Sequence, residues 1–154
     1  MYLCFMNYPE GSHVPYLLTF QIGALNLRIL RECNKIFKES NLPLEMDQIP
    51  VILSLYYLNG GTQQEVAQRI QRDKSSVNRT ISFLQKNELV KASEDANDKR
   101  KTIIELTATG KKIAKKASEL LENLDKSVTE VLTVKEKEQF QDMLLKLIAK
   151  VSAL

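Results

Sequence analysis

Histidine and cysteine are scarce in this sequence, and each scarcity argues against a class of function. The 154 residues include one histidine, His13, two cysteines and no tryptophan. Cys4 and Cys33 cannot build a disulfide framework and form no CxxC pair, which favours a reducing, cytoplasmic setting. With one histidine, a histidine-based catalytic triad or a histidine-rich metal site is hard to build. We therefore expect no metal and no cofactor.

Long apolar runs are also absent. No run reaches the roughly 18 residues that span a bilayer, and no basic segment typical of a signal peptide opens the chain. The longest apolar stretch, residues 14–25, is interrupted by Thr19, Gln21 and Gly23. The sequence also shows no nucleophile–base pair and no glycine loop suited to phosphate. It therefore predicts a protein that is neither an enzyme nor bound to a membrane.

An excess of positive charge is present, but in one part of the chain only. The composition, 44% hydrophobic and 27% charged with a net charge of +3, is typical of a soluble globular domain. Between Thr62 and Lys112, eleven lysines and arginines stand against seven acids, so this stretch carries +4 and the rest −1. The basic middle third is where a polyanionic partner is expected.

Apolar spacing predicts a mainly α-helical chain with a small β-hairpin. An apolar stripe that begins at Leu18 and includes Cys33, expected in the core, indicates the first helix, with Pro15 in its first turn. Thr107 is expected to cap a long helix, and the capping box that begins at Thr133 opens the last one. Residues 1–13 show no periodicity and are expected to be an N-terminal arm or disordered. The helices expected outside the basic third cover residues 15–39, 45–58, 107–132 and 133 onwards.

Two short helices and a charged hairpin occupy the basic third. Thr62 to Glu65 reads as a capping box for the first short helix. Asp73 is a good N-cap for the second, from Lys74 to about Lys86. Two β-branched or apolar runs, 89–92 and 101–106, then enclose a polar tip. This order is typical of a winged helix-turn-helix.

Each part of this pattern suits double-stranded DNA. The first short helix presents free amides to a phosphate, and the second, with small or hydrogen-bonding outward residues, fits the major groove. An arginine at the hairpin tip fits a narrow minor groove. The residues predicted to contact DNA are Thr62, Gln63, Gln64, Lys74, Ser75, Ser76, Asn78, Arg79, Ser82, Lys99, Arg100 and Lys101.

At these residues the chain resembles the MarR family of bacterial transcriptional regulators. The most specific motif is Asp98-Lys99-Arg100 followed by Leu106-Thr107, which is similar to the family's wing signature D-x-R-x5-L-T. The resemblance implies a homodimer, held by the first and last two helices, on a pseudo-palindromic operator. It also implies a repressor released by a ligand or an oxidant, with Arg100 in the minor groove and Asp98 holding it in place. Gly61 departs from the family, which often has an apolar residue there, so the small third strand is expected to be weak.

The expected organisation is one domain, residues 1–154. Residues 45–107 would form the DNA-binding region, and residues 14–40 and 108–154 the dimerisation helices, whose apolar stripes exceed what a small winged domain covers. The predicted function is a homodimeric, sequence-specific DNA-binding regulator, most simply a repressor relieved by a small-molecule effector. The alternative is a winged-helix module that binds another protein and not DNA, because acids dilute the field of the wing. Aromatic residues are expected to pack in the core or the dimer, or to line an effector pocket: Tyr16, Phe20, Tyr56, Tyr57 and Phe140.

Overall fold

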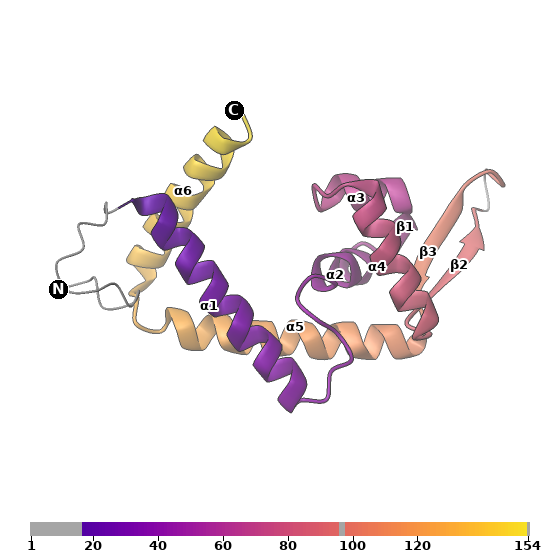
Figure 1. The fold of residues 1–154 in the computed structure, drawn as a ribbon, viewed down its shortest axis with the longest axis horizontal. Helices are drawn as coiled ribbons and strands as arrows, with labels where there is room; N and C mark the ends of the chain where they lie inside the picture. The colour runs from indigo at the N-terminus through magenta and orange to yellow at the C-terminus, as the bar shows by residue number, and fades with distance from the viewer. Residues whose placement is uncertain (1–16, 96–97, 154) are drawn as a thin grey trace. The chain divides into compact units, whose positions relative to one another are not determined.

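A computed structural model describes residues 17–95 and 98–153 (Figure 1). The chain divides into two compact units. The first unit is Met1–Glu32 and the second is Cys33–Leu154. Helix α1 (Leu18–Glu39) runs through both. The expected arm over 1–13, the first-turn Pro15, and Tyr16 all lie outside the described residues.

The second unit contains five further helices and three strands. These are α2 (Ile49–Tyr57), β1 (Gly61–Thr62), α3 (Gln63–Arg69), α4 (Lys74–Lys86), β2 (Val90–Glu94), β3 (Thr102–Leu106), α5 (Ala108–Thr129) and α6 (Val134–Val151). The expectation of a mainly helical chain with a winged helix-turn-helix is confirmed. Among residues 17–95 and 98–153, no helix combines the length and the apolar character that a bilayer crossing requires.

The start of α2 was placed too early from the sequence. The helix begins at Ile49 and not at Glu45, with proline in its first turn, where the missing N–H costs no hydrogen bond. The preceding residues form turns that long-range contacts hold: the Met46 N–H donates to the side-chain oxygen of Asn34 at 3.2 Å. The apolar spacing that was used to place the helix continues into these turns, so it could not reveal this contact.

The sheet is antiparallel with the order β1-β3-β2. The hairpin is longer than expected, because β2 continues to Glu94 and pairs it with Thr102. The third strand is present but only two residues long, with Gly61 opposite Ile104. Gly61 has a φ of +154° and Gly60 a φ of +93°, a backbone conformation that other residues rarely adopt. The weak third strand expected from Gly61 is therefore what the structure has.

The core of the second unit lies where α2, α4 and the N-terminal half of α5 meet the sheet. Its most buried large side chains include Phe37, Ile52, Leu55 and Leu84. Cys33 is 2% exposed, which confirms it as a core residue. Burial of these apolar groups is the main favourable term in folding and makes the core a rigid support for α3, α4 and the hairpin.

Side-chain burial does not continue along the whole of the two C-terminal helices, α5 and α6. Ala114 and Ala117 of α5 are fully buried, but Val128, on the same expected stripe, is exposed. Helix α6 has no buried residue, although its capping box between Thr133 and Glu136 is formed as predicted. Most of its apolar side chains are therefore exposed in a single chain.

Candidate nucleic-acid interface

Helix α4 has one buried face and one exposed face. Its N-cap is Asp73, whose carboxylate accepts the Ser76 N–H at 2.7 Å. Val77, Ile81 and Leu84 follow at helical spacing and are buried against the core. The opposite face exposes five of the residues predicted to contact DNA: Lys74, Ser75, Asn78, Arg79 and Ser82.

Ser76 was also expected to face outward, but unlike these five residues it is half-buried. Its carbonyl accepts the hydroxyl of Thr80 at 3.3 Å, and Thr80 is only 7% exposed. Any DNA contact by Ser76 would therefore come from the edge of the exposed face.

Helix α3 holds its predicted residues by hydrogen bonds within the protein. The Thr62 hydroxyl accepts the Glu65 N–H at 3.2 Å, and the Glu65 carboxylate accepts the Thr62 N–H at 2.7 Å, which is the predicted capping box. The hydrogen bond from the Thr62 backbone lowers the pKa of Glu65 below its ordinary value. Gln63 donates to the carbonyl of Lys74 at 3.3 Å and so ties α3 to the start of α4, whereas Gln64 is exposed.

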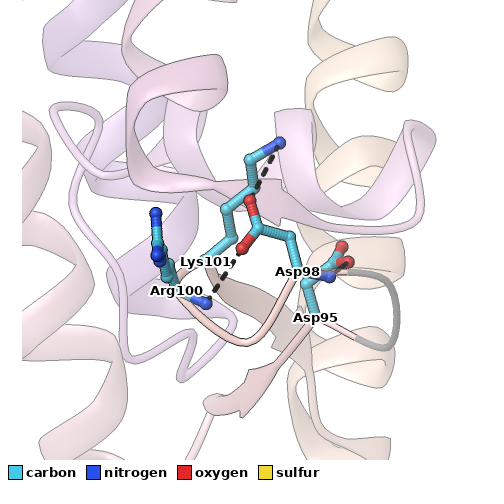
Figure 2. Close-up of polar contacts among 4 residues, drawn as sticks. All are labelled: Asp95, Asp98, Arg100 and Lys101. Carbon is cyan, nitrogen blue, oxygen red and sulfur yellow. Dashed lines mark hydrogen bonds and ion pairs between the residues drawn. The ribbon is translucent and has the colours of Figure 1, made fainter.

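The tip of the hairpin is organised by two aspartates (Figure 2). Asp95 accepts the backbone N–H of Asp98 at 2.9 Å, and Asp98 in turn accepts the backbone N–H of Arg100 at 3.1 Å. The second oxygen of Asp98 lies 3.9 Å from the Lys101 ammonium. Figure 2 shows the Arg100 guanidinium pointing away from the Asp98 carboxylate. Asp98 thus orders the backbone at Arg100 and leaves the arginine head available.

The cations of the basic third fall into two groups. Arg69 donates to the Gly60 carbonyl at 3.0 Å, and Arg72 donates to the Asp47 carbonyl at 2.6 Å, so both serve the fold. Lys91 pairs with Glu105 at 3.2 Å across the hairpin. By contrast, four of the five cations predicted to contact DNA are exposed, and their charged groups have no hydrogen-bonding or ionic partner among the described residues: Lys74, Arg79, Lys99 and Arg100. The β2–β3 hairpin, whose tip carries Lys99 and Arg100, is the wing.

Thr107 and Gly110, at the start of α5, anchor the base of the hairpin. The Thr107 hydroxyl donates to the Glu88 carbonyl at 2.8 Å and accepts the Gly110 N–H at 3.0 Å. The Thr107 N–H donates to the Leu89 carbonyl at 3.0 Å. A Cβ on Gly110 would overlap that same carbonyl oxygen, so glycine is required for the close approach. The sequence predicted Thr107 as the cap, but Gly110 was not singled out. The one signal for its role was the presence of a glycine in the first turn of a helix.

Residues 44–102, which contain all of these groups except Glu105, Thr107 and Gly110, match the sequence model of the MarR family. The match to the MarR family covers the winged-helix region, which is less than half of the chain. The chain is also similar to the HTH-type transcriptional repressor NicR of Pseudomonas putida, at 27% identity over 101 residues. The match spans 64% of each chain, so it covers less than two thirds of NicR.

Solved structures with the same fold cover most of the chain. The crystal structure of Staphylococcus aureus MepR in complex with DNA has a TM-score of 0.79 at 20% identity, covering 88% of this chain and 99% of MepR. The transcriptional regulator SlyA has a TM-score of 0.78 at 24% identity, covering 88% and 94%. Apo MarR of E. coli has a TM-score of 0.67 at 24% identity, covering 88% and 98%. These likenesses establish the winged-helix fold of the chain.

Proposed function

We propose that this protein is a MarR-family regulator, a homodimer that binds DNA sequence-specifically and controls transcription. The observation that carries the proposal is the set of unpaired cations on one exposed helix face and on the adjoining wing. Helix α4 would be the recognition helix in the major groove, with Asn78 and Arg79 reading base edges. Arg100 would enter the minor groove from the wing, supported by Asp98.

The homodimer is supported by the exposed apolar side chains of α6. Phe140, Met143, Ile148 and Val151 lie on a helix without a buried residue, and each is at least 43% exposed. Contiguous apolar surface of this kind marks an interaction site. A second copy of the chain would cover it and would present two recognition helices about 34–36 Å apart, one turn of duplex. Dimerisation through residues 14–40 and 108–154 is part of the proposal.

The repressor role is supported by the similarity to NicR, which is itself a transcriptional repressor. A repressor has to leave its operator when the product of the controlled gene is needed. A small-molecule ligand would cause this release if it favoured an arrangement of the protein that cannot bind DNA. The proposal is therefore a repressor relieved by a ligand.

The test is a selection of duplexes from random DNA by the full-length protein, followed by titration of the selected site at several salt concentrations. We expect a preferred site with two-fold symmetry, and affinity that falls as salt rises. Arg100→Ala should weaken binding about tenfold, whereas Lys115→Ala, a surface change on α5 away from the wing, should leave it unchanged. If no duplex is selected, the protein is better explained as a winged-helix module for another protein.

A further inference from the structure

The turn between α3 and α4 has a backbone that hydrogen bonds hold in place. The N–H of Gln71 donates to the Gln68 carbonyl at 3.3 Å, and the N–H of Arg72 donates to the Ala67 carbonyl at 3.1 Å. Gln71 has a φ of +52°, which is the left-handed conformation. Together these features form a Schellman motif, in which two hydrogen bonds close the end of a helix. The turn therefore leads from α3 to Asp73, the N-cap of α4, along a defined path.

The side chain of Arg72 ties this turn to the segment that precedes α2. Its guanidinium donates to the Asp47 carbonyl at 2.6 Å, although twenty-five residues separate the two in the chain. Gln48 is the N-cap of α2, so the Asp47 carbonyl lies before the helix and takes no part in its hydrogen bonds. Arg72 is half-buried, in contrast to the exposed Arg79 of α4. The residue directly before the N-cap of α4 is thus fixed to another part of the fold.

The position of the start of α4 determines where its outward side chains stand. Asn78 and Arg79 lie on the exposed face within two turns of the N-cap Asp73. A side chain that reads a base edge must match the hydrogen-bonding groups of that base, and such sites must be held to within about 0.5 Å. Contacts with phosphate act through charge and carry no sequence information. A small shift of α4 would therefore weaken sequence-specific binding more than non-specific binding.

We propose that Arg72 is a positioning residue for the recognition helix and sets the sequence specificity of DNA binding without contacting DNA. Its hydrogen bond to the Asp47 carbonyl holds the turn before α4 against the segment before α2, which enters the core at the buried Ile49. When this bond is lost, the first turn of α4 can shift. Base edges are then misaligned with the helix, while phosphate contacts persist. The inference rests on the proposed DNA-binding function and concerns the same surface.

Arg69 is a matched structural control, because it makes the same kind of hydrogen bond at another place. Its guanidinium donates to the Gly60 carbonyl at 3.0 Å, directly before β1. Arg69 is the last residue of α3, whereas Arg72 adjoins the N-cap of α4. Loss of either hydrogen bond should lower the stability of the protein. Only loss of the Arg72 bond should change the reading of bases.

The test compares three variants of the full-length protein on two duplexes, one selected from random DNA and one of random sequence. Arg72→Met, Arg69→Met and Lys74→Met each remove a cation and keep an unbranched stem. Each is titrated at several salt concentrations, at a temperature where circular dichroism shows it to be folded. Lys74 is the first residue of α4, and its exposed ammonium has no partner among the described residues.

The three variants should give three different results. Arg72→Met should weaken binding to the selected duplex about tenfold, because a hydrogen bond made by a charged group is lost. Its affinity for the random duplex and its salt slopes, of log K against log salt, should stay as in the wild type. Arg69→Met should lower Tm and leave both affinities unchanged. Lys74→Met should make the salt slope shallower by about 0.9 on both duplexes, because a phosphate contact is lost.

A measurement without DNA tests the positioning itself. Hydrogen–deuterium exchange of the free protein should become faster at the start of α4 in Arg72→Met, including the Ser76 N–H that the Asp73 carboxylate accepts. Exchange in the wing should be unchanged. In Arg69→Met the faster exchange should be centred on the turn at Gly60 and should leave the start of α4 as in the wild type.

Four results would overturn the role of Arg72. These are wild-type exchange at the start of α4 in Arg72→Met, wild-type affinity for the selected duplex, an equal loss of affinity on both duplexes, and a shallower salt slope. The last of these would show that Arg72 contacts phosphate. If the wild type binds no duplex, the proposed DNA-binding function fails, and the exchange measurement still decides whether Arg72 positions α4.

Discussion

Gly110→Ala is expected to destabilise the protein, although alanine is the better helix former. The new Cβ would overlap the carbonyl oxygen of Leu89 and lie 2.9 Å from its carbonyl carbon. Both atoms belong to the backbone, so no rotamer change can relieve the contact, and α5 must move away from the start of β2. Overpacking of this kind costs roughly 1–3 kcal/mol.

The movement would also weaken the anchor of the hairpin. The Leu89 carbonyl accepts the Thr107 N–H at 3.0 Å, and the Thr107 hydroxyl donates to the neighbouring Glu88 carbonyl at 2.8 Å. Each of these hydrogen bonds contributes about 1 kcal/mol. The gain in helix propensity from glycine to alanine is about 1 kcal/mol and opposes these losses. We expect a net loss of about 2–4 kcal/mol in the free energy of unfolding, or roughly 5–15 °C in Tm.

The matched control is Gly23→Ala in α1. No atom lies within 4 Å of the position where its Cβ would stand, and Gly23 lies away from the apolar stripe of its helix. Here the same substitution should stabilise the protein by about 0.5–1 kcal/mol. Urea and thermal unfolding, followed by circular dichroism at equal protein concentration, would measure both variants. If Gly110→Ala were as stable as the wild type, the close approach at Leu89 would not be a constraint on this fold.

Three further changes probe the wing, the helix caps and the α2–α5 contact. Asp98→Ala should weaken duplex binding severalfold with little change in Tm, because the backbone at the wing arginine loses its acceptor; Asp98→Asn, which keeps one oxygen, should retain more affinity in the same titration. Hydrogen bonds within the capping boxes lower the pKa of Glu65 and of Glu136, so their stabilisation is present above the ordinary carboxyl pKa of 4.5 and is lost as pH falls below it. Urea unfolding between about pH 6 and pH 3 should show this loss, and the double glutamine variant should flatten it. The Ser118 hydroxyl donates to a carboxylate, so the Tyr57 hydroxyl donates to it at 2.5 Å, and Tyr57→Phe should cost about 1 kcal/mol of stability in the same assay.

Local signals allowed α4 to be predicted to the residue, because Asp73 caps it and its buried positions repeat at helical spacing. Both capping boxes were predicted for the same reason, since each joins residues three apart. The early start given to α2 was wrong because its preceding turn depends on Asn34, which is twelve residues from its partner. Long-range contacts of this kind leave no local pattern in a sequence.

The same limit applies to the charges of the basic third. When charges are counted along the sequence, Arg69 and Arg72 contribute to the basic excess in the same way as Arg79. In the structure their guanidinium groups donate to backbone carbonyls nine and twenty-five residues away, so their side chains are committed to the fold. The division of cations into structural and available ones could not be predicted, and it changes which residues are expected to meet phosphate.

This division predicts how strongly binding should depend on salt. Four of the cations predicted to contact DNA have charged groups without a partner among the described residues: Lys74, Arg79, Lys99 and Arg100. A single winged helix would therefore neutralise about four phosphates, and two would neutralise about eight. Because log K falls with log salt by about 0.9 per neutralised phosphate, one winged helix would give a slope of about −4 and two would give about −7. Binding of a two-fold-symmetric duplex, followed by fluorescence anisotropy from about 50 to 200 mM salt, should give the steeper slope. A slope near −4 on that duplex, with two chains bound, would mean that the second winged helix does not contact DNA. That result would refute binding through both winged helices and would leave recognition by one of them intact.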